Sequence, residues 1–429
     1  MAANSDISRP VGTICTAQAP LLDWTAGIRV KLEITGPWRY FSAFRCGPHQ
    51  HQTQGASRQH WRGGAVCLLF KNDVVESFVG VATSSDAVHF HPGFQRVVDA
   101  TWKSARMTHN LAIAGPTGPY GPSRSFLLVG GQFNKDRKER GERPGPPNDG
   151  VWLARWPVAS AAAALELQQA AGSRGRGDNS GNSGGRGSGS RGTRLSDGAR
   201  RLFNGSHPGC VERRRKRLNL HPGSNASDKA GKACEFDGRL SLVNFRRRWL
   251  LYARANPTAR GHRYVQLTSS DDRMSAWRPF QMITIKDYGA LDGDLYFFSV
   301  FNNPVDANSL VAIFPLIQRG EDRSAPVPSC IGISASLDGL SWSPMTPLAR
   351  CPFVDPLKER ALCHPAGLIG SAADSGNVLL YIHNSVPAPD RYGPGTKRSN
   401  SVQPPASLTM HPIRRVVLKA WTKRALASI

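Results

Sequence analysis

One pattern of short strands recurs along this chain and constrains the fold more than any other feature. Its clearest copy starts near Asp237, with strands expected at 240–243, 249–256 and 264–267 and a further apolar run at 280–285. Polar turns separate these segments, whose lengths and content of aromatic and aliphatic residues are typical of β-strands. Four such strands in succession predict one small antiparallel sheet.

The unit recurs five times. Its copies start near residues 37, 109, 236, 292 and 363. Three copies carry a Ser-x-Asp box after the third strand, as Ser84/Asp86, Ser269/Asp271 and Ser336/Asp338. Units of about 40 to 50 residues with four strands each are typical of β-propeller blades, whereas a two-domain sandwich would not place the boxes in phase. The sequence therefore predicts an all-β, five-bladed β-propeller, with six blades as the alternative.

The gap between the second and third units is longer than the period because it holds an insertion. Residues 172–199 are Gly, Ser, Arg and Asn with almost no apolar content. Such a segment cannot offset the entropy of ordering, so we interpret it as disordered and followed by a basic loop to residue 230. The expected organisation is an entry segment at 1–27, a single propeller domain at 28–421 and a tail at 422–429. The last strand of the propeller is expected at 413–421.

Positive charge is concentrated in the same region. The chain has a formal net charge of +24, and between Arg174 and Arg217 there are 12 Lys or Arg residues against 3 acids. This favours polyanionic partners such as nucleic acid or acidic glycans, and the basic run at 213–217 is a candidate polyanion patch. The alternative is a solvated loop under weak constraint. Nucleic-acid binding through the insertion is kept as one hypothesis.

The eight cysteines are too sparse for a disulfide scaffold. They include no C-x-x-C pair, so no zinc site is indicated. A bridge between Cys210 and Cys234 and a set of buried free thiols both remain open. Residues 1–19 lack an apolar core of signal-peptide length and nothing approaches a membrane span, so the chain is cytosolic as written or has a leader upstream. We expect a monomer. No P-loop or dinucleotide fingerprint occurs, so no cofactor is expected, with a calcium ion in the central channel as the alternative.

The box at residues 336–342 carries a resemblance. It reads Ser336-x-Asp338-Gly339-x-Ser341-Trp342 and looks like the Asp-box of sialidase-type propellers. With five units, and with acids where first strands begin, the chain resembles the five-bladed glycoside hydrolases of the arabinanase, β-xylosidase, invertase and levansucrase kind. The resemblance covers most of residues 37–421. It implies a carbohydrate-active protein whose acids converge at the top of the central channel.

The resemblance also implies catalytic residues. Asp237 stands where the family has its third-blade Asp, a transition-state stabiliser or pKa modulator, and Asp292 and Asp294 lie near the fourth-blade acid, usually Glu. Such a pair suits glycoside hydrolysis, which needs one protonated and one ionised carboxyl across the scissile bond. The first unit, at 38–44, begins without the expected carboxylate, so His109 is the candidate replacement base. The alternative is that an Asp before Gly only binds its own turn.

Further side chains at the same strand ends are candidates for binding a sugar, because amide, imidazole and charged groups suit its hydroxyls. They are Asn110, Glu235, Arg239, Arg254, Asn256 and His364. Their alternative roles are structural hydrogen bonding or plain solvation. The Ser and Asp of the three boxes are interpreted as turn-forming and not catalytic. A propeller that is catalytically silent and uses the same face to bind glycans or a protein partner is the competing hypothesis.

Overall fold

The computed structural model describes the chain in segments that carry its strands and its C-terminal helix. These segments are 15, 20–22, 27–32, 38–46, 66–72, 78–93, 112–117, 125–132, 150–157, 200–204, 236, 240–255, 263–289 without 272, 294–317 without 296, 330–350, 362–370, 376–386 and 407–429. The predicted insertion at 172–199, residues 205–230 of the basic loop after it, and Cys234 lie outside the described residues, and so does Cys210. Residues 200–204, expected in that loop, form a strand.

Five of the six described sheets contain four or five strands, and each is named here after one strand. The β3 sheet has the order β2 (Lys31–Leu32), β6 (His89–Gly93), β5 (Phe78–Ser84), β4 (Val66–Asn72), β3 (Trp38–Arg45). The β7 sheet has the order β10 (Arg200–Asn204), β9 (Gly150–Pro157), β8 (Ser125–Gln132), β7 (Ala112–Thr117). The β11 sheet has the order β11 (Ser241–Phe245), β12 (Arg248–Ala255), β13 (Tyr264–Asp271), β14 (Gln281–Met282).

The remaining sheets come from the C-terminal half and the N-terminus. The β17 sheet contains β16 (Asp294–Leu295) and β17 (Ser299–Asn302), both paired to β18 (Leu310–Ile317), then β19 (Cys330–Ser336) and β21 (Thr346–Arg350). The β22 sheet has the order β1 (Ile28–Arg29), β24 (Ser407–Arg414), β23 (Asn377–Val386), β22 (Leu362–Gly370). The small sixth sheet pairs β15 (Thr284–Ile285) with β20 (Ser341–Trp342) in parallel.

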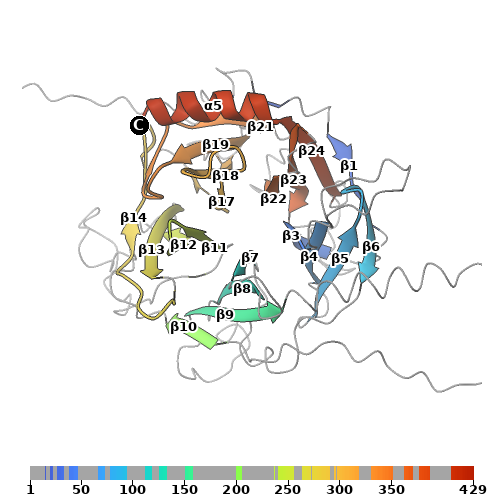
Figure 1. Cartoon of the computed structure of the whole chain (residues 1–429), viewed down its shortest axis with the longest axis horizontal. Helices are drawn as coiled ribbons and strands as arrows, with labels where there is room; N and C mark the ends of the chain where they lie inside the picture. The colour runs from blue at the N-terminus through green and yellow to red at the C-terminus, as the bar shows by residue number, and fades with distance from the viewer. Residues whose placement is uncertain are drawn as a thin grey trace, which may run out of the picture.

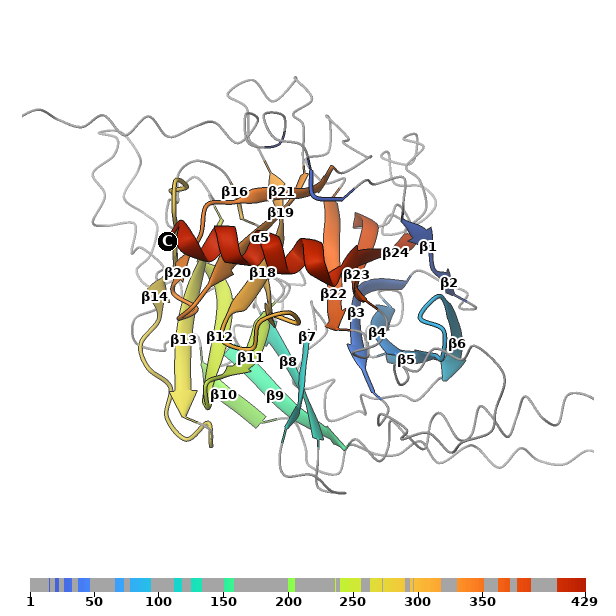
Figure 2. The same ribbon diagram turned by 45° about the horizontal axis from the view of Figure 1, so that its top comes forward.

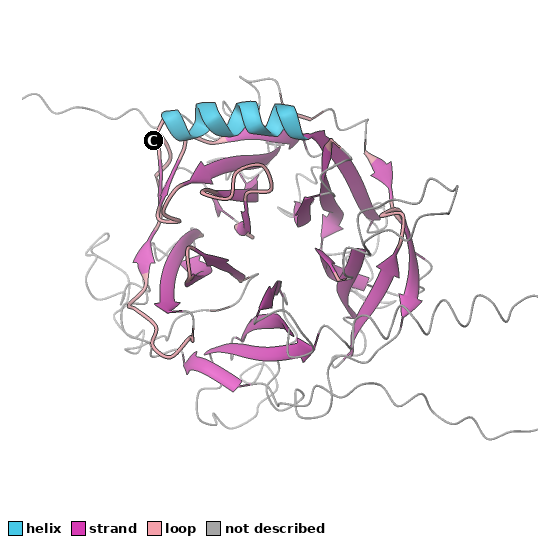
Figure 3. Cartoon of the chain, viewed as in Figure 1, coloured by secondary structure: helices cyan, strands magenta, loops and turns pink. Residues whose placement is uncertain are grey.

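The sheets stand around a common centre, with β3, β7, β11, β17 and β22 nearest to it (Figure 1). Each sheet contacts the next: β22 meets β3, β3 meets β7, β7 meets β11, β11 meets β17, and β18 meets β22. Strands dominate the described part of the chain (Figure 3). Antiparallel sheets arranged radially in this way form a β-propeller, which confirms the predicted all-β propeller, while the number of blades stays a prediction.

A glycine allows two innermost strands to approach closely. A Cβ on Gly367 of β22 would lie 2.4 Å from the carbonyl oxygen of Ala43 on β3, too close for any other residue without a backbone shift. The Arg45 guanidinium, at the end of β3, donates to the carbonyl of Gly370 at the end of β22. Because strand ends meet strand ends, these two strands run in the same direction.

The C-terminus differs from the sequence prediction. A closing strand at 413–421 and a tail at 422–429 were expected, but β24 ends at Arg414 and the helix α5 (Arg415–Ala427) follows. Its buried residues are Leu418, Trp421, Thr422 and Ala425, at the 3–4 spacing of one helix face. Adjacent valines at the start of the segment had favoured a strand. The helix lies along the outside of the propeller (Figures 1 and 2).

The run at 280–285 also differs from its prediction, which had it closing its own sheet. Only β14 pairs with β13, whereas β15 pairs in parallel with β20 in the separate two-stranded sheet. In the second unit, β10 pairs with β9 on the outer edge. The chain therefore leaves the β7 sheet after its third strand and returns after the insertion to add the fourth.

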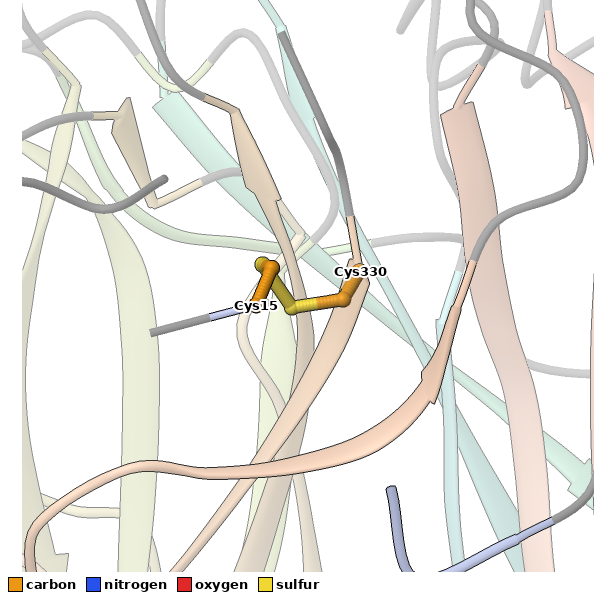
Figure 4. Close-up of a disulfide and its surroundings, with 2 residues drawn as sticks. All are labelled: Cys15 and Cys330. Atoms are coloured by element: carbon orange, nitrogen blue, oxygen red, sulfur yellow. A yellow bond between two sulfur atoms is a disulfide. The ribbon is translucent and has the colours of Figure 1, made fainter. Parts of the chain in front are cut away.

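The N-terminal strap, made of residues 15, 20–22 and 27–32, crosses three sheets. Cys15 forms a disulfide with Cys330 of β19 (Figure 4), and Leu21 and Leu22 donate backbone hydrogen bonds of 3.1 and 2.9 Å to the carbonyls of residues 347 and 348. Further along, β1 pairs with β24, and β2 pairs with β6. The strap therefore joins the sheets built from the C-terminal strands to the first sheet of the chain.

A second disulfide joins Cys46 to Cys67 within the β3 sheet, and Cys363 is buried. The buried apolar residues form clusters that lie between neighbouring sheets. One cluster includes Trp342 between the β11 and β17 sheets, and another includes Tyr381 between the β22 and β3 sheets. The interfaces between sheets are thus the hydrophobic core of the molecule.

Candidate functional site

Most candidate residues from the sequence precede or open the first strands of the sheets, whereas Arg254 and Asn256 lie at the end of β12. His109 and Asn110 come before β7, Asp237 comes before β11, and Asp292 comes before β16. The side chains that lie outside the described residues are those of His109, Asn110, Glu235, Asp237, Arg239, Asn256 and Asp292. For Asp294 only the backbone is described, and it pairs with Ile317 of β18. The roles of these residues stay predictions.

His364 is the best described of the candidates. It is the third residue of β22 and is 4% exposed. Its imidazole meets the ring of Phe297 edge-on, with centroids 4.0 Å apart and planes at 74°. An aromatic pair in this geometry is favourable, so His364 holds the innermost strand of the β22 sheet against the β17 sheet. Its predicted contact with a sugar stays a prediction.

Phe297 reaches His364 because the innermost strand of its sheet is bulged. Leu295 is opposite Leu316 and Ser299 is opposite Ile313, so the inner strand holds one more residue than β18 between these pairs. Phe297 has a φ of +53° and is 7% exposed. A positive φ is strained for a bulky residue. Nothing in the aromatic run 296–298 of the sequence signals this kink.

A reciprocal hydrogen bond joins the innermost strands of the β11 and β17 sheets. The Ser241 hydroxyl donates to the Val300 carbonyl at 3.2 Å and accepts from the Val300 N–H at 2.9 Å. Both residues are buried, at 7% and 4% exposure. Asp237 and Asp294 lie within six residues of this contact along the chain.

Arg254 lies near the end of β12 and is half-buried. Its carbonyl accepts a 2.8 Å hydrogen bond from the side-chain amide of Gln266, on the neighbouring strand. This end of β12 is the one from which the chain passes on to β13. The structure therefore places Arg254 at a strand end, as predicted, and its binding role stays a prediction.

Buried polar residues on β23 were not singled out from the sequence. His383 is opposite His364 in the strand register and meets Phe41 of β3 edge-on at 4.8 Å. Asn384 donates through its amide nitrogen to the hydroxyls of Ser407 and Thr409, at 3.3 Å each. In the sequence, the adjacent His383 and Asn384 after an apolar run were the feature that could have indicated these buried polar residues.

The boxes use their carboxylates to hold turns. Asp86 accepts hydrogen bonds from Ser84 and from the N–H groups of Val88 and His89 at 2.7–2.9 Å. Asp338 does the same with Ser336 and the N–H groups of Leu340 and Ser341. The residues that donate these hydrogen bonds to the two carboxylates are Ser84, Val88, His89, Ser336, Leu340 and Ser341. The predicted turn-forming role of these two boxes is confirmed.

The electrostatics of the two boxes agree with this role. Burial raises the pKa of Asp86, but the hydrogen bonds from the N–H groups of His89 and Val88 lower it by more, so that the pKa falls to about 2. The pKa of Asp338 is likewise lowered by the backbone N–H groups of Ser341 and Leu340, against an opposing effect of burial. Both carboxylates are therefore ionised at neutral pH and are unsuited to proton transfer there.

No metal-binding group of three or more His, Cys, Asp or Glu side chains occurs within the described segments. The predicted channel calcium therefore concerns residues outside them and stays a prediction. The helices described in this chain include none long and apolar enough to cross a membrane.

Comparisons with known proteins give likeness of fold at low sequence identity. No family model and no curated protein matches the sequence. The structure of an N-acetylgalactosamine deacetylase from F. plautii with blood group B trisaccharide is similar at TM-score 0.44 and 9% identity, over 94% of this chain and 97% of that one. An α-L-arabinofuranosidase of Fusarium graminearum gives 0.43 and 8%, over 92% and 99%.

A third similar structure is a sucrose-6-phosphate hydrolase from Lactobacillus gasseri. It gives a TM-score of 0.42 and 11% identity, over 93% of this chain and 62% of that one. The fold assignment rests on the strand pairing and the sheet contacts described above.

Proposed function

We propose that this chain is a five-bladed β-propeller that acts on a glycan at the end of its axis where the innermost strands begin. The observation that carries the proposal is the circuit of contacts among β22, β3, β7, β11 and the β17 sheet. If each of the five large sheets is one blade, the segments just before β7, β11 and β16 converge at one channel mouth. Those segments hold the predicted acids and imidazole.

In this proposal the carboxylates divide the chemistry between them. Asp237 comes from the third blade, and Asp292 or Asp294 from the fourth. One carboxyl protonates the leaving oxygen, and the other stabilises the developing cation or activates water, because their environments separate their pKa values. His109 serves as the base that the first blade lacks. Sugar hydroxyls are bound by side chains at the same mouth, namely Asn110, Glu235, Arg239, Arg254, Asn256 and His364.

The test is product release from furanosides, xylosides, fructosides and sialosides by the purified chain and by Asp237→Asn. Loss of a catalytic carboxyl lowers turnover by about 10²- to 10⁴-fold. Asp338→Asn is the matched control, since it removes the same charge from a box turn, and we expect it to keep wild-type turnover. Full turnover by Asp237→Asn would contradict the assignment of the centre.

One observation favours a silent, glycan-binding propeller as the second candidate. The strand β3 begins Trp38-Arg39-Tyr40, with no carboxylate where the resemblance expects the first-blade acid. If this function holds, the protein binds an oligosaccharide, releases no product, and keeps its affinity in Asp237→Asn. Turnover on any member of the panel excludes it.

A further inference from the structure

The turn that joins β11 to β12 carries arginines in a backbone conformation that arginine disfavours. Phe245 is paired with Arg248, so the turn has two residues, Arg246 and Arg247. Their φ values are +49° and +60°, both left-handed, as in a type I′ hairpin. Such turns strongly prefer Asn-Gly, because a Cβ is strained at positive φ. Stability therefore does not account for the choice of residues here.

Contacts to the rest of the protein orient the first arginine of this turn. The Arg246 guanidinium lies over the Phe245 ring, 5.0 Å from its centroid. Its Nη2 also donates a 3.1 Å hydrogen bond to the carbonyl of Asn308, in the turn between β17 and β18. Arg246, Arg247 and Arg248 are all exposed. The turn and the first residue of β12 thus present three guanidinium groups to solvent, one of them fixed in direction.

A second turn of the same sheet adds to this surface. Arg248 is opposite Asp271 in the strand register, so the turn after β13 is adjacent to the Arg246–Arg247 turn. That turn exposes Arg273 and Arg278. The Asp271 carboxylate accepts hydrogen bonds of 3.0 and 2.6 Å from the backbone and hydroxyl of Ser275. We call the five residues Arg246, Arg247, Arg248, Arg273 and Arg278 the arginine surface.

The part of the sequence that carries this surface is basic overall. Residues 240–289, with the five arginines of the surface included, contain nine Lys or Arg and three acids. The arginine surface lies where β11 ends, whereas the proposed reaction centre lies where β11 begins. It is therefore a separate part of the molecule, at the opposite end of the strand.

We propose that the arginine surface binds an anionic polysaccharide, through its sulfate or carboxylate groups. The planar guanidinium donates paired hydrogen bonds that match these groups. A linear polyanion spans several guanidinium groups at once, which suits five arginines on two adjoining turns. The disulfides Cys15–Cys330 and Cys46–Cys67 indicate an oxidising compartment, where acidic glycans are the abundant polyanions. Strain at Arg246 and Arg247 is then retained for binding.

The test replaces the strained turn with its unstrained counterpart. In Arg246→Asn/Arg247→Gly the turn gains the preferred I′ pair, so we expect a higher melting temperature. Affinity for dextran sulfate is expected to fall at least tenfold, and the slope of log K against log salt to decrease by about two. The control Lys419→Gln/Lys423→Gln removes the same charge from the exposed face of α5 and is expected to change the affinity less than twofold.

Several results would overturn the proposal. They are wild-type affinity in the turn variant, an equal loss in the α5 control, or equal binding of uncharged dextran. Duplex DNA binding as tightly as dextran sulfate, with the same loss in the turn variant, would overturn the polysaccharide assignment. The measurement uses no turnover, so failure of the proposed reaction leaves its outcome unaffected.

Discussion

At the scale of single residues, Asp86 shows how a half-exposed carboxylate can hold a turn. Its Oδ1 accepts the backbone N–H groups of Val88 and His89, and its Oδ2 lies 2.6 Å from the His89 imidazole. Burial opposes ionisation, but the hydrogen bonds outweigh it and lower the pKa to about 2. Charge-assisted hydrogen bonds of this kind are stronger than neutral ones.

This pKa shift predicts a pH-dependent contribution to stability. An Asp whose folded pKa lies below its usual value of about 3.9 stabilises the fold above that pH, and the contribution is lost as the pH falls toward 2. We expect Asp86→Asn to lower the free energy of unfolding by about 1 kcal/mol at pH 7, since the site is partly screened by solvent. The difference from wild type, measured by denaturant unfolding, shrinks between pH 4 and pH 2.

The exposed Asp287 provides the control for this measurement. Asp287→Asn removes the same charge from another turn, so a stability difference that follows pH equally in both variants would mean that net charge, and not the box, is responsible.

At the scale of elements, two sheet interfaces are built in the same way. The Tyr252 hydroxyl of β12 donates to the carbonyl of Gly339 at 2.9 Å, and the Tyr381 hydroxyl of β23 donates to the carbonyl of Ala87 at 2.7 Å. Each tyrosine also meets the box aromatic edge-on, at 6.1 Å for Trp342 and 6.2 Å for Phe90. A box therefore docks on the second strand of the preceding sheet in both cases.

The repeated interface predicts equal energetic effects at two distant sites. Tyr252→Phe and Tyr381→Phe each remove one buried hydrogen bond to a backbone carbonyl, so each is expected to cost about 1 kcal/mol of unfolding free energy. Tyr264→Phe is the control, because its hydroxyl lies 3.4 Å from the Tyr288 carbonyl and the loss is smaller. A loss at Tyr252 without one at Tyr381 would contradict the equivalence of the two interfaces.

Local patterns explain how much of the elements could be predicted. Strands and boxes depend on neighbours in sequence, and β5 and β19 end at the box serines Ser84 and Ser336 as the pattern requires. The remaining box was expected to pair Ser269 with Asp271. The strand β13 instead continues to Asp271, and the Asp271 carboxylate accepts hydrogen bonds from the hydroxyls of Ser270 and Ser275. A shift of strand end by two residues is invisible in a Ser-x-Asp motif.

At the scale of the whole molecule, contacts between distant residues limit what the sequence can predict. The N-terminal strap lacks a strand period, and its partners on β24, β6 and β19 are identified only in three dimensions. Cysteine parity left the pairing open; neither disulfide of the described residues was predicted, and the bridge between Cys210 and Cys234 stays a prediction. The candidate site residues could be proposed from the sequence because strand starts are indicated by neighbouring residues. The bulge at Phe297 that joins two innermost strands had no such signal.

The strap predicts different stabilities for variants that lack one disulfide or the other. Cys15 and Cys330 are 315 residues apart, whereas Cys46 and Cys67 are 21 apart. The entropy of the unfolded chain is restricted more by the longer loop, so Cys15→Ser/Cys330→Ser is expected to cost about 5 kcal/mol and Cys46→Ser/Cys67→Ser about 3 kcal/mol. Denaturant unfolding under non-reducing conditions measures both. If the short-loop variant lost more stability, the strap would not be the element that closes the ring of sheets.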